Sequence, residues 1–286
     1  MRRRSDARWP ALCLAMVASG VFASAAAADR LAIPGSHLYY EVHGEGRPMV
    51  LIHGGNLDAG MWDDDVPVLA KSFRVITYDV RPYGRSGPVT DDYAWHEDLR
   101  ALLDHLKIAR ADLVGLSLGA RLAINFAIAY PSRVDRLVLA GPGLDGYAWT
   151  PDPLVAGLVA AVKAGDAAKA TALWLEHPYM APGMRDPTRA VRLRKLAERN
   201  QHIWLQPVGP SVVPKPPAAT RLAEITAPTL VIVGTLDVPD ILGIADRLTA
   251  EVRGARKVVL PDVGHLINLE APERFRALVT DFLRRR

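Results

Sequence analysis

The chain has 286 residues, half of them apolar, so it can bury a sizeable core as one large domain or as a domain carrying an insertion. This length excludes a small fold that depends on disulfides. The formal net charge of +4 falls to +1 without residues 1–28, which carry four Arg and one Asp, so the charge balance favours neither nucleic acid nor an anionic membrane as a partner.

The first thirty residues have the pattern of a secretory signal peptide. A basic start with four arginines precedes an apolar run at about 11–22 and a small-residue segment that ends at Ala28. The run is shorter than the roughly 18 residues that a membrane span needs. We predict cleavage near Ala28, export to the periplasm or the medium, and no stable membrane insertion of the mature chain. An uncleaved anchor and a start codon placed too early are the alternatives.

The single cysteine, Cys13, lies inside this predicted signal peptide. The mature chain would therefore contain no thiol and no disulfide. Thiol redox chemistry and a thiolate metal site are excluded for it.

From residue 37 onward, short apolar strands alternate with helical patterns, which is typical of a largely parallel sheet with helices on both faces. Residues 37–42 are predicted to be an antiparallel edge strand. Six further strands are predicted by β-branched or leucine-rich runs at 49–53, 74–79, 111–116, 134–140, 229–234 and 256–260, each of which ends near Gly, Pro or Asp. Apolar residues at helical spacing predict helices at about 95–106, 118–130 and 271–285.

Nearly ninety residues between the strands 134–140 and 229–234 contain no convincing strand, which is too long for a loop in a compact domain. Helical runs near 153–165, 166–177 and 187–201 predict a helical cap over the carboxyl edge of the sheet. We therefore divide the mature chain into a core at 29–143, a cap at 144–219 and a second core part at 220–286. Residues 207–219 contain five prolines and are expected to form a stiff return to the core.

A Gly-x-Ser-x-Gly motif at 115–119 follows a predicted strand and opens a predicted helix. In that context the motif is a nucleophile elbow, a tight turn that exposes the hydroxyl of Ser117 above the sheet edge. Residues two before and two after the serine crowd this turn, so Gly115 and Gly119 must be nearly free of side chain. The sequence therefore predicts Ser117 to be a nucleophile.

A serine hydroxyl needs a base to accept its proton and a carboxylate to orient that base. His265 follows the strand 256–260 and Asp237 follows the strand 229–234, so both lie at carboxyl strand ends, where catalytic groups collect in α/β sheets. Asp240 is the alternative acid, although its place at the start of the next helix suits a capping carboxylate. We predict a Ser117, Asp237 and His265 triad.

An oxyanion formed during catalysis needs backbone N–H donors. Leu118 follows the nucleophile and supplies one of them. The second is assigned to Gly55 in the segment Ile52-His53-Gly54-Gly55-Asn56, with Asn56 as the alternative, and the His53 side chain is interpreted as structural.

Several landmarks of the chain together resemble the α/β-hydrolase family over nearly all of the mature length: His-Gly-Gly at 53–55, Asp-Val-Arg-Pro-Tyr-Gly-Arg-Ser-Gly at 79–87, the elbow at 115–119, Gly-Thr-Leu-Asp at 234–237, and Gly-His at 264–265 with Glu270. The resemblance implies an eight-stranded sheet, a helical lid, no cofactor or metal, and an acyl-enzyme mechanism on esters or lactones. Haloalkane dehalogenases and epoxide hydrolases of this fold carry Asp at the elbow, so Ser117 argues against both. The elbow sequence Gly-Leu-Ser-Leu-Gly is similar to the elbow sequences of enol-lactonases and small carboxylesterases.

The sequence therefore predicts a serine hydrolase for a small-molecule ester or lactone. A carbon–carbon bond hydrolase, a perhydrolase or an amidase with the same triad, and a slow-turnover ligand receptor, are the alternatives. The loop arginines Arg81 and Arg85 are interpreted as structural, with attraction of a substrate carboxylate as the alternative. Six cap residues are candidates for the lining of a pocket, although most of them are expected to form the cap's own core: Trp149, Trp174, Tyr179, Met180, Met184 and Trp204.

Overall fold

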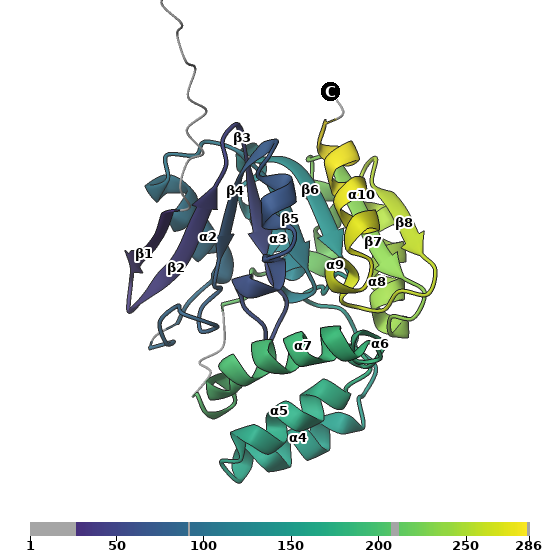
Figure 1. Ribbon diagram of the computed structural model, residues 1–286. Coiled ribbons are helices and arrows are strands. Elements are labelled where there is room, and N and C mark those ends of the chain that lie inside the picture. The colour runs from purple at the N-terminus through teal and green to yellow at the C-terminus, as the bar shows by residue number, and fades with distance from the viewer. Residues whose placement is uncertain (1–26, 91, 207–211, 285–286) are drawn as a thin grey trace, which may run out of the picture.

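The computed structural model describes residues 27–90, 92–206 and 212–284. Eight strands form one sheet in the order β1-β2-β4-β3-β5-β6-β7-β8 (Figure 1). β2 pairs antiparallel with both of its neighbours, and β4, β3, β5, β6, β7 and β8 are parallel. The strands are β1 (Ala27–Ile33), β2 (Ser36–His43), β3 (Arg47–Ile52), β4 (Phe73–Tyr78), β5 (Ala111–Leu116), β6 (Val134–Ala140), β7 (Thr229–Gly234) and β8 (Arg256–Leu260).

Helices cover both faces of the sheet and form the cap. The α-helices are α1 (Val66–Leu69), α2 (Trp95–His105), α3 (Leu118–Ala129), α4 (Leu154–Lys163), α5 (Ala167–Glu176), α6 (Ala181–Met184), α7 (Pro187–Arg199), α8 (Pro239–Glu251), α9 (Ile267–Glu270) and α10 (Pro272–Arg284). Short 3-10 helices are η1 (Ala59–Trp62), η2 (Pro131–Arg133), η3 (Gln201–Leu205), η4 (Ala218–Thr220) and η5 (Leu222–Glu224).

The core lies in two layers because successive side chains of a strand point to opposite faces. Along β3, Val50 and Ile52 pack with α2, α3 and α8, whereas Met49 and Leu51 pack with η1, α1 and α10. The central strands are buried on both faces, which explains why they are continuous apolar runs in the sequence. The eight-stranded, mostly parallel sheet with an inserted helical cap is therefore confirmed.

The helices α4, α5 and α7 lie beyond the carboxyl ends of the parallel strands (Figure 1). Buried polar contacts hold the end of α7 to the core loops that follow β3 and β4. Asn200 donates to the Asp58 carboxylate at 2.9 Å and accepts from the Gly84 N–H at 2.7 Å, and Arg199 forms an ion pair with Asp58 at 2.7 Å. The cap is thus fixed over the carboxyl ends of these strands.

One prediction about the sheet edge is wrong. The predicted edge strand 37–42 lies within β2, and β1 covers it as the true edge strand. The two strands form a hairpin in which Ile33 pairs with Ser36 across Pro34 and Gly35, and Gly35 has a positive φ of 66°. Because an Ala-rich segment precedes β1, the sequence pattern favoured the end of a signal peptide there.

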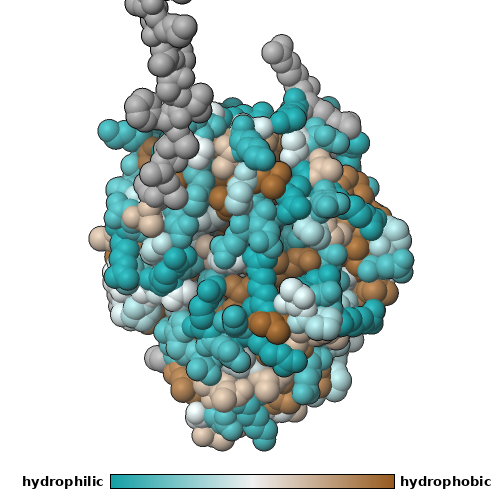
Figure 2. All heavy atoms as spheres, in the orientation of Figure 1, coloured by the Kyte–Doolittle hydropathy of each residue, from teal (hydrophilic) through white to brown (hydrophobic). Residues whose placement is uncertain are grey.

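The predicted signal peptide lies almost entirely outside the described residues, and cleavage after Ala28 would remove only the first two residues of β1. It stays a prediction, as do the bounds of the cap at 144–219, since residues 207–211 of the predicted return segment are not described. Within the described part of the chain, no helix is long and apolar enough to cross a bilayer. The face shown in Figure 2 is mostly hydrophilic, with scattered hydrophobic side chains.

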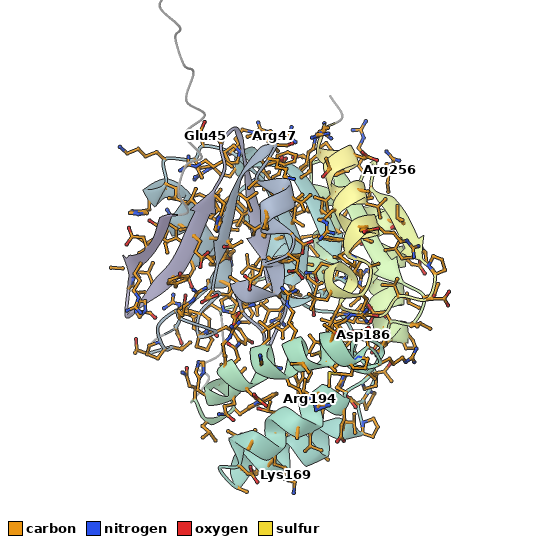
Figure 3. All side chains as sticks on the ribbon, viewed as in Figure 1. Glu45, Arg47, Lys169, Asp186, Arg194 and Arg256 are labelled. Atoms are coloured by element: carbon orange, nitrogen blue, oxygen red, sulfur yellow. The ribbon has the colours of Figure 1, made fainter. Side chains whose placement is uncertain are left out.

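Asp112 on β5 is a buried carboxylate at the end of the sheet that lies opposite the cap. Its partner Arg47 is labelled at that end in Figure 3, far from the cap residues Asp186 and Arg194. Arg47 Nε lies 2.7 Å from Asp112 Oδ2, yet burial dominates and raises the pKa of Asp112 to about 7.

This raised pKa predicts a pH-dependent loss of stability. The folded-state pKa lies above the ordinary value of 3.8, so between roughly pH 4 and pH 7 the folded chain holds a proton that the unfolded chain has lost, and the free energy of unfolding falls as the pH rises through that window. We expect Asp112→Asn to raise the free energy of unfolding by about 2 kcal/mol more near pH 8 than near pH 5. Urea unfolding at both pH values measures this, and an equal effect at both would contradict it.

Candidate active site

Ser117 occupies a sharp turn between β5 and α3. Its backbone has φ 55° and ψ −110°, a conformation that residues other than glycine rarely adopt. A Cβ on Gly115 would lie 2.4 Å from the Gly119 backbone, and a Cβ on Gly119 would lie 2.1 Å from the Ile52 carbonyl oxygen. The turn therefore requires glycine at both positions, as the motif predicted.

The loop after β3 lies against the first turn of α3. A Cβ built on Gly55 would contact the Leu118 Cβ at 3.8 Å. Leu118 is the first residue of α3, so its N–H has no acceptor within the helix and carries part of the positive end of the helix dipole. The backbones of Gly55 and Leu118 thus lie side by side, as an oxyanion hole requires.

Asn56, the alternative donor, has a positive φ of 59° and lies near the buried Tyr83 hydroxyl. Burial raises the pKa of the Tyr83 hydroxyl to about 12, and a hydrogen bond from the Asn56 backbone opposes that rise. Gly55 and its alternative Asn56 therefore both stay predictions for the second donor.

Asp237 and His265 form a buried hydrogen-bonded pair. His265 Nδ1 lies 2.9 Å from Asp237 Oδ2 and 3.1 Å from Oδ1, and the two residues are 3% and 7% exposed, respectively. A carboxylate accepts only, so Nδ1 carries the proton and Nε2 is the nitrogen that can take a proton from a nucleophile. Asp240 instead accepts from the Thr150 N–H and hydroxyl, both at 2.9 Å. The structure therefore pairs His265 with Asp237 and not with Asp240, which lies in the first turn of α8.

Glu270 fixes the backbone on either side of His265. Its two carboxylate oxygens accept from the Gly264 N–H at 2.7 Å and the Leu266 N–H at 3.0 Å. The sequence analysis named Glu270 only as a landmark. A carboxylate five residues after a histidine can close such a loop, which is the signal that could have identified its role.

The segment after β6 touches both Ser117 and His265. The Ser117 N–H donates to the Ala140 carbonyl at 2.9 Å, and the Gly143 N–H donates to the Ser117 carbonyl at 3.2 Å. A Cβ on Gly141 would lie 3.0 Å from His265 Nδ1. Among the described residues, no hydrogen bond joins Ser117 Oγ to His265. Such catalytic hydrogen bonds often tighten only when substrate is bound.

His53 has the structural role that the sequence predicted for its side chain. Its Nε2 accepts from the Val80 N–H at 2.8 Å and its Nδ1 lies 2.8 Å from the Gly54 carbonyl oxygen, to which it donates. Burial lowers the pKa of His53, so the ring is held in its neutral form. It joins the loop after β3 to the loop after β4.

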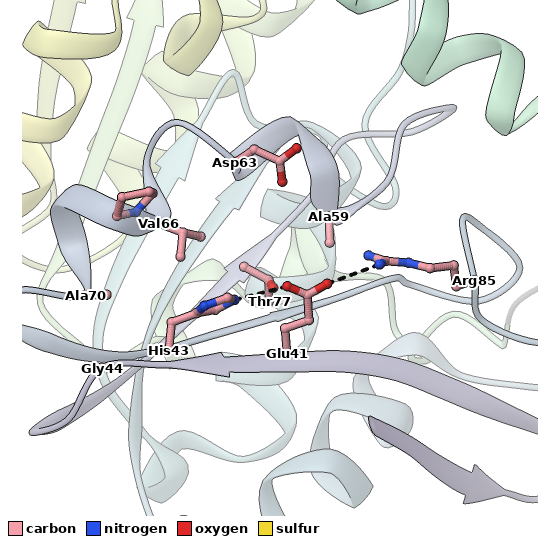
Figure 4. A pocket seen from close by; sticks show the side chains of 10 residues that line it. Glu41, His43, Gly44, Ala59, Asp63, Val66, Ala70, Thr77 and Arg85 are labelled. Carbon is pink, nitrogen blue, oxygen red and sulfur yellow. Dashed lines mark hydrogen bonds and ion pairs between the residues drawn. The ribbon is translucent and has the colours of Figure 1, made fainter. Parts of the chain in front are cut away.

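Arg81 and Arg85 also belong to the scaffold. Arg81 forms a bidentate ion pair with the buried Asp98, at 2.8 and 2.6 Å. Arg85 pairs with Asp79 at 3.2 Å and with Glu41 at 3.1 Å. Figure 4 shows the Arg85 and Glu41 pair at a surface pocket, and none of the residues drawn there belongs to the predicted triad.

The six cap residues divide into two groups. Three line a groove of about 460 Å³ between the cap and the start of α8: Trp149, Trp174 and Tyr179. The other three pack within the cap or between the cap and the core: Met180, Met184 and Trp204. The centroid of the Tyr179 ring lies 4.5 Å from that of the His265 ring, so one lining residue of the groove contacts the candidate base, although no predicted triad residue itself lines the groove.

Three comparisons relate the chain to known proteins. A model described as the alpha/beta hydrolase family matches residues 49–278. A 2-hydroxy-6-oxononadienedioate/2-hydroxy-6-oxononatrienedioate hydrolase of Paraburkholderia xenovorans is 32% identical over 86% of this chain and 90% of its own length.

Solved structures agree with this match. The enol-lactonase from Burkholderia xenovorans has a TM-score of 0.75 and 27% identity, over 90% of this chain and 100% of its own. A thermophilic esterase from Thermogutta terrifontis has a TM-score of 0.74 and 26% identity, over 90% of this chain and 98% of its own. The similar proteins thus include hydrolases of three descriptions.

Proposed function

This chain belongs to the alpha/beta hydrolase family, and we propose that it is a serine hydrolase that cleaves carboxylic esters or lactones through an acyl-enzyme on Ser117. The single observation that supports the proposal is the buried Asp237 and His265 pair, which shares the segment after β6 with the glycine-bounded turn of Ser117. A base oriented by a carboxylate is what a serine hydroxyl needs to act as a nucleophile near neutral pH.

In the proposed mechanism, His265 Nε2 takes the proton of Ser117 as its Oγ attacks the carbonyl carbon. The N–H groups of Gly55 and Leu118 bind the oxyanion of the tetrahedral intermediate. His265 then protonates the leaving alcohol oxygen, and the acyl group stays on Ser117. Water, deprotonated by the same nitrogen, attacks the acyl carbon. The bond between that carbon and Ser117 Oγ then breaks, His265 returns the proton to Oγ, and the acid is released, while Asp237 keeps His265 in the required tautomer.

A carbon–carbon bond hydrolase is the second candidate, because the names of several relatives at about 30% identity describe hydrolases of 2-hydroxy-6-oxo acids. The same three side chains would serve that reaction. The dioates in two of those names carry two carboxylates and the dienoate in the third carries one. A carboxylate binds most strongly to a cationic partner such as Arg or Lys.

The groove beside His265 supports the ester or lactone reading. Among the described residues that line it, none is Lys or Arg, and two are Asp152 and Asp240. The remaining lining is mostly aromatic and aliphatic, so an uncharged substrate loses less hydration there than a dianion, which the two carboxylates would also repel.

A substrate panel tests the proposal. We expect kcat/KM for neutral p-nitrophenyl esters or lactones of increasing chain length to exceed that for a 2-hydroxy-6-oxo-dienedioate by at least about tenfold, which is a modest electrostatic difference of about 1.4 kcal/mol. The Ser117→Ala variant supplies the background rate for every substrate. A faster reaction with the dienedioate would make carbon–carbon bond hydrolysis the function.

A further inference from the structure

A column of aromatic rings runs from the cap to the candidate base. Trp174 stacks on His177 with ring centroids 5.1 Å apart, His177 stacks on Tyr179 at 4.4 Å, and the Tyr179 ring covers the His265 ring at 4.5 Å. The interplanar angles along the column are 28°, 24° and 36°, so the first two pairs are stacked and the Tyr179 ring is tilted against the His265 ring. The cap thereby contacts the imidazole directly.

Tyr179 is held in this column by a second histidine and carboxylate pair. Its backbone N–H donates to His177 Nδ1 at 3.2 Å, which leaves the ring hydrogen on Nε2, and Nε2 donates to the Asp152 carboxylate. The Leu154 N–H and His177 both lower the pKa of Asp152, the former more strongly, so the carboxylate is ionised at neutral pH. Both the backbone and the ring of Tyr179 are therefore fixed by His177.

We propose that Tyr179 is a positioning residue for His265, which keeps the imidazole in the orientation that presents Nε2 to Ser117 and stabilises its protonated form during proton transfer. This inference rests on the proposed serine hydrolase mechanism. The face of a tyrosine ring is electron-rich, and a cation held above it in a desolvated place is stabilised. An imidazolium is formed at His265 each time that Ser117 gives up its proton.

The charged groups around the column are consistent with a role for the ring and not for the hydroxyl. Burial, and then the carboxylates of Asp237, Asp240 and Asp152, raise the pKa of Tyr179 to about 12. The phenol therefore stays protonated over the working pH range. His265 itself faces the carboxylate of Asp237 and the ring of Tyr179, while Glu270 holds only the backbone beside it.

Tyr179 also lines the groove, so a role in positioning must be separated from a role in substrate binding. Loss of a substrate contact raises KM. Loss of imidazolium stabilisation lowers kcat and moves the acidic limb of the kcat/KM profile to lower pH, because the protonated histidine becomes less favourable. A substrate-binding role would therefore be seen in KM, whereas a positioning role would be seen in kcat and in the pH profile.

The test compares Tyr179→Leu, which removes the ring, with Tyr179→Phe, which keeps it, in the full chain. We expect Tyr179→Leu to lower kcat by about 5- to 30-fold and to shift the acidic limb downward, and Tyr179→Phe to retain most of kcat. Tyr179→Met is a second non-aromatic variant in case the Leu variant does not fold. The control Trp204→Leu removes a cap ring that contacts Trp174, at the end of the column away from His265, and is expected to lower thermal stability without moving the acidic limb of the pH profile.

An NMR titration of the His265 Hε1 proton gives a readout that needs no substrate. We expect its midpoint to be lower in Tyr179→Leu than in the wild-type chain and in Tyr179→Phe. The positioning role would be overturned if the non-aromatic variants kept the wild-type kcat, the wild-type acidic limb of the kcat/KM profile and the wild-type midpoint of the His265 titration. It would also be overturned if Tyr179→Phe were as impaired as Tyr179→Leu. A chain that hydrolyses no ester or lactone yet shows the midpoint shift would refute the proposed function alone.

Discussion

Replacement of Ser117 by alanine is expected to lower kcat/KM for an ester or lactone by about 10⁴- to 10⁶-fold, because the members of a triad act as a unit. The residual rate would come from the oxyanion donors and from substrate binding. The fold should persist, since the Ser117 side chain makes no hydrogen bond among the described residues and its turn is set by the flanking glycines.

Steady-state kinetics on purified protein measure this change, with circular dichroism and thermal unfolding as checks on the fold. Ser132→Ala is a matched control, because Ser132 lies exposed on η2, away from the candidate site. A Ser117→Ala variant that kept more than about a tenth of the wild-type rate would mean that another group is the nucleophile.

Asp237→Asn is expected to lower kcat by about 10³- to 10⁴-fold, with little change in KM. The amide donates a hydrogen bond where the carboxylate accepts one from His265 Nδ1, so the ring would favour the tautomer with the proton on Nε2. That nitrogen could then no longer take a proton from Ser117.

The matched control is Asp240→Asn, a carboxylate three residues away that binds Thr150 and not His265. Its kcat should stay within about threefold of the wild-type value, since its change does not reach the base. If the two variants lost activity to the same extent, the structural distinction between the two acids would be wrong.

Much of the fold could be predicted because the central strands are buried on both faces. β5, β6 and β7 coincide with the predicted runs, and so does β8, although β8 is a largely exposed edge strand. β1 was not predicted, since its first residues continue an Ala-rich segment and its strand character depends on pairing with β2. A strand that depends on its partner carries a weak signal of its own.

The candidate site likewise has one part that the sequence predicts and another part that it does not. Ser117, Asp237 and His265 each follow a recognisable strand, so their place at one sheet edge could be inferred from order and spacing. Tyr179, His177 and Asp152 have no such signal, because the cap brings them together across 25 residues and only its folding places Tyr179 on His265. The cap groove is likewise a property of packing between elements and not of any motif.

The most direct measurement is reaction of the wild-type chain with a fluorophosphonate, followed by digestion and mass spectrometry of the labelled peptide. We expect one phosphonyl group per chain, bonded to Ser117 Oγ, at a rate that falls steeply in His265→Gln, which has no imidazole to accept the proton. Labelling at a different residue, or labelling of Ser117 that is equally fast without the imidazole at position 265, would contradict the account.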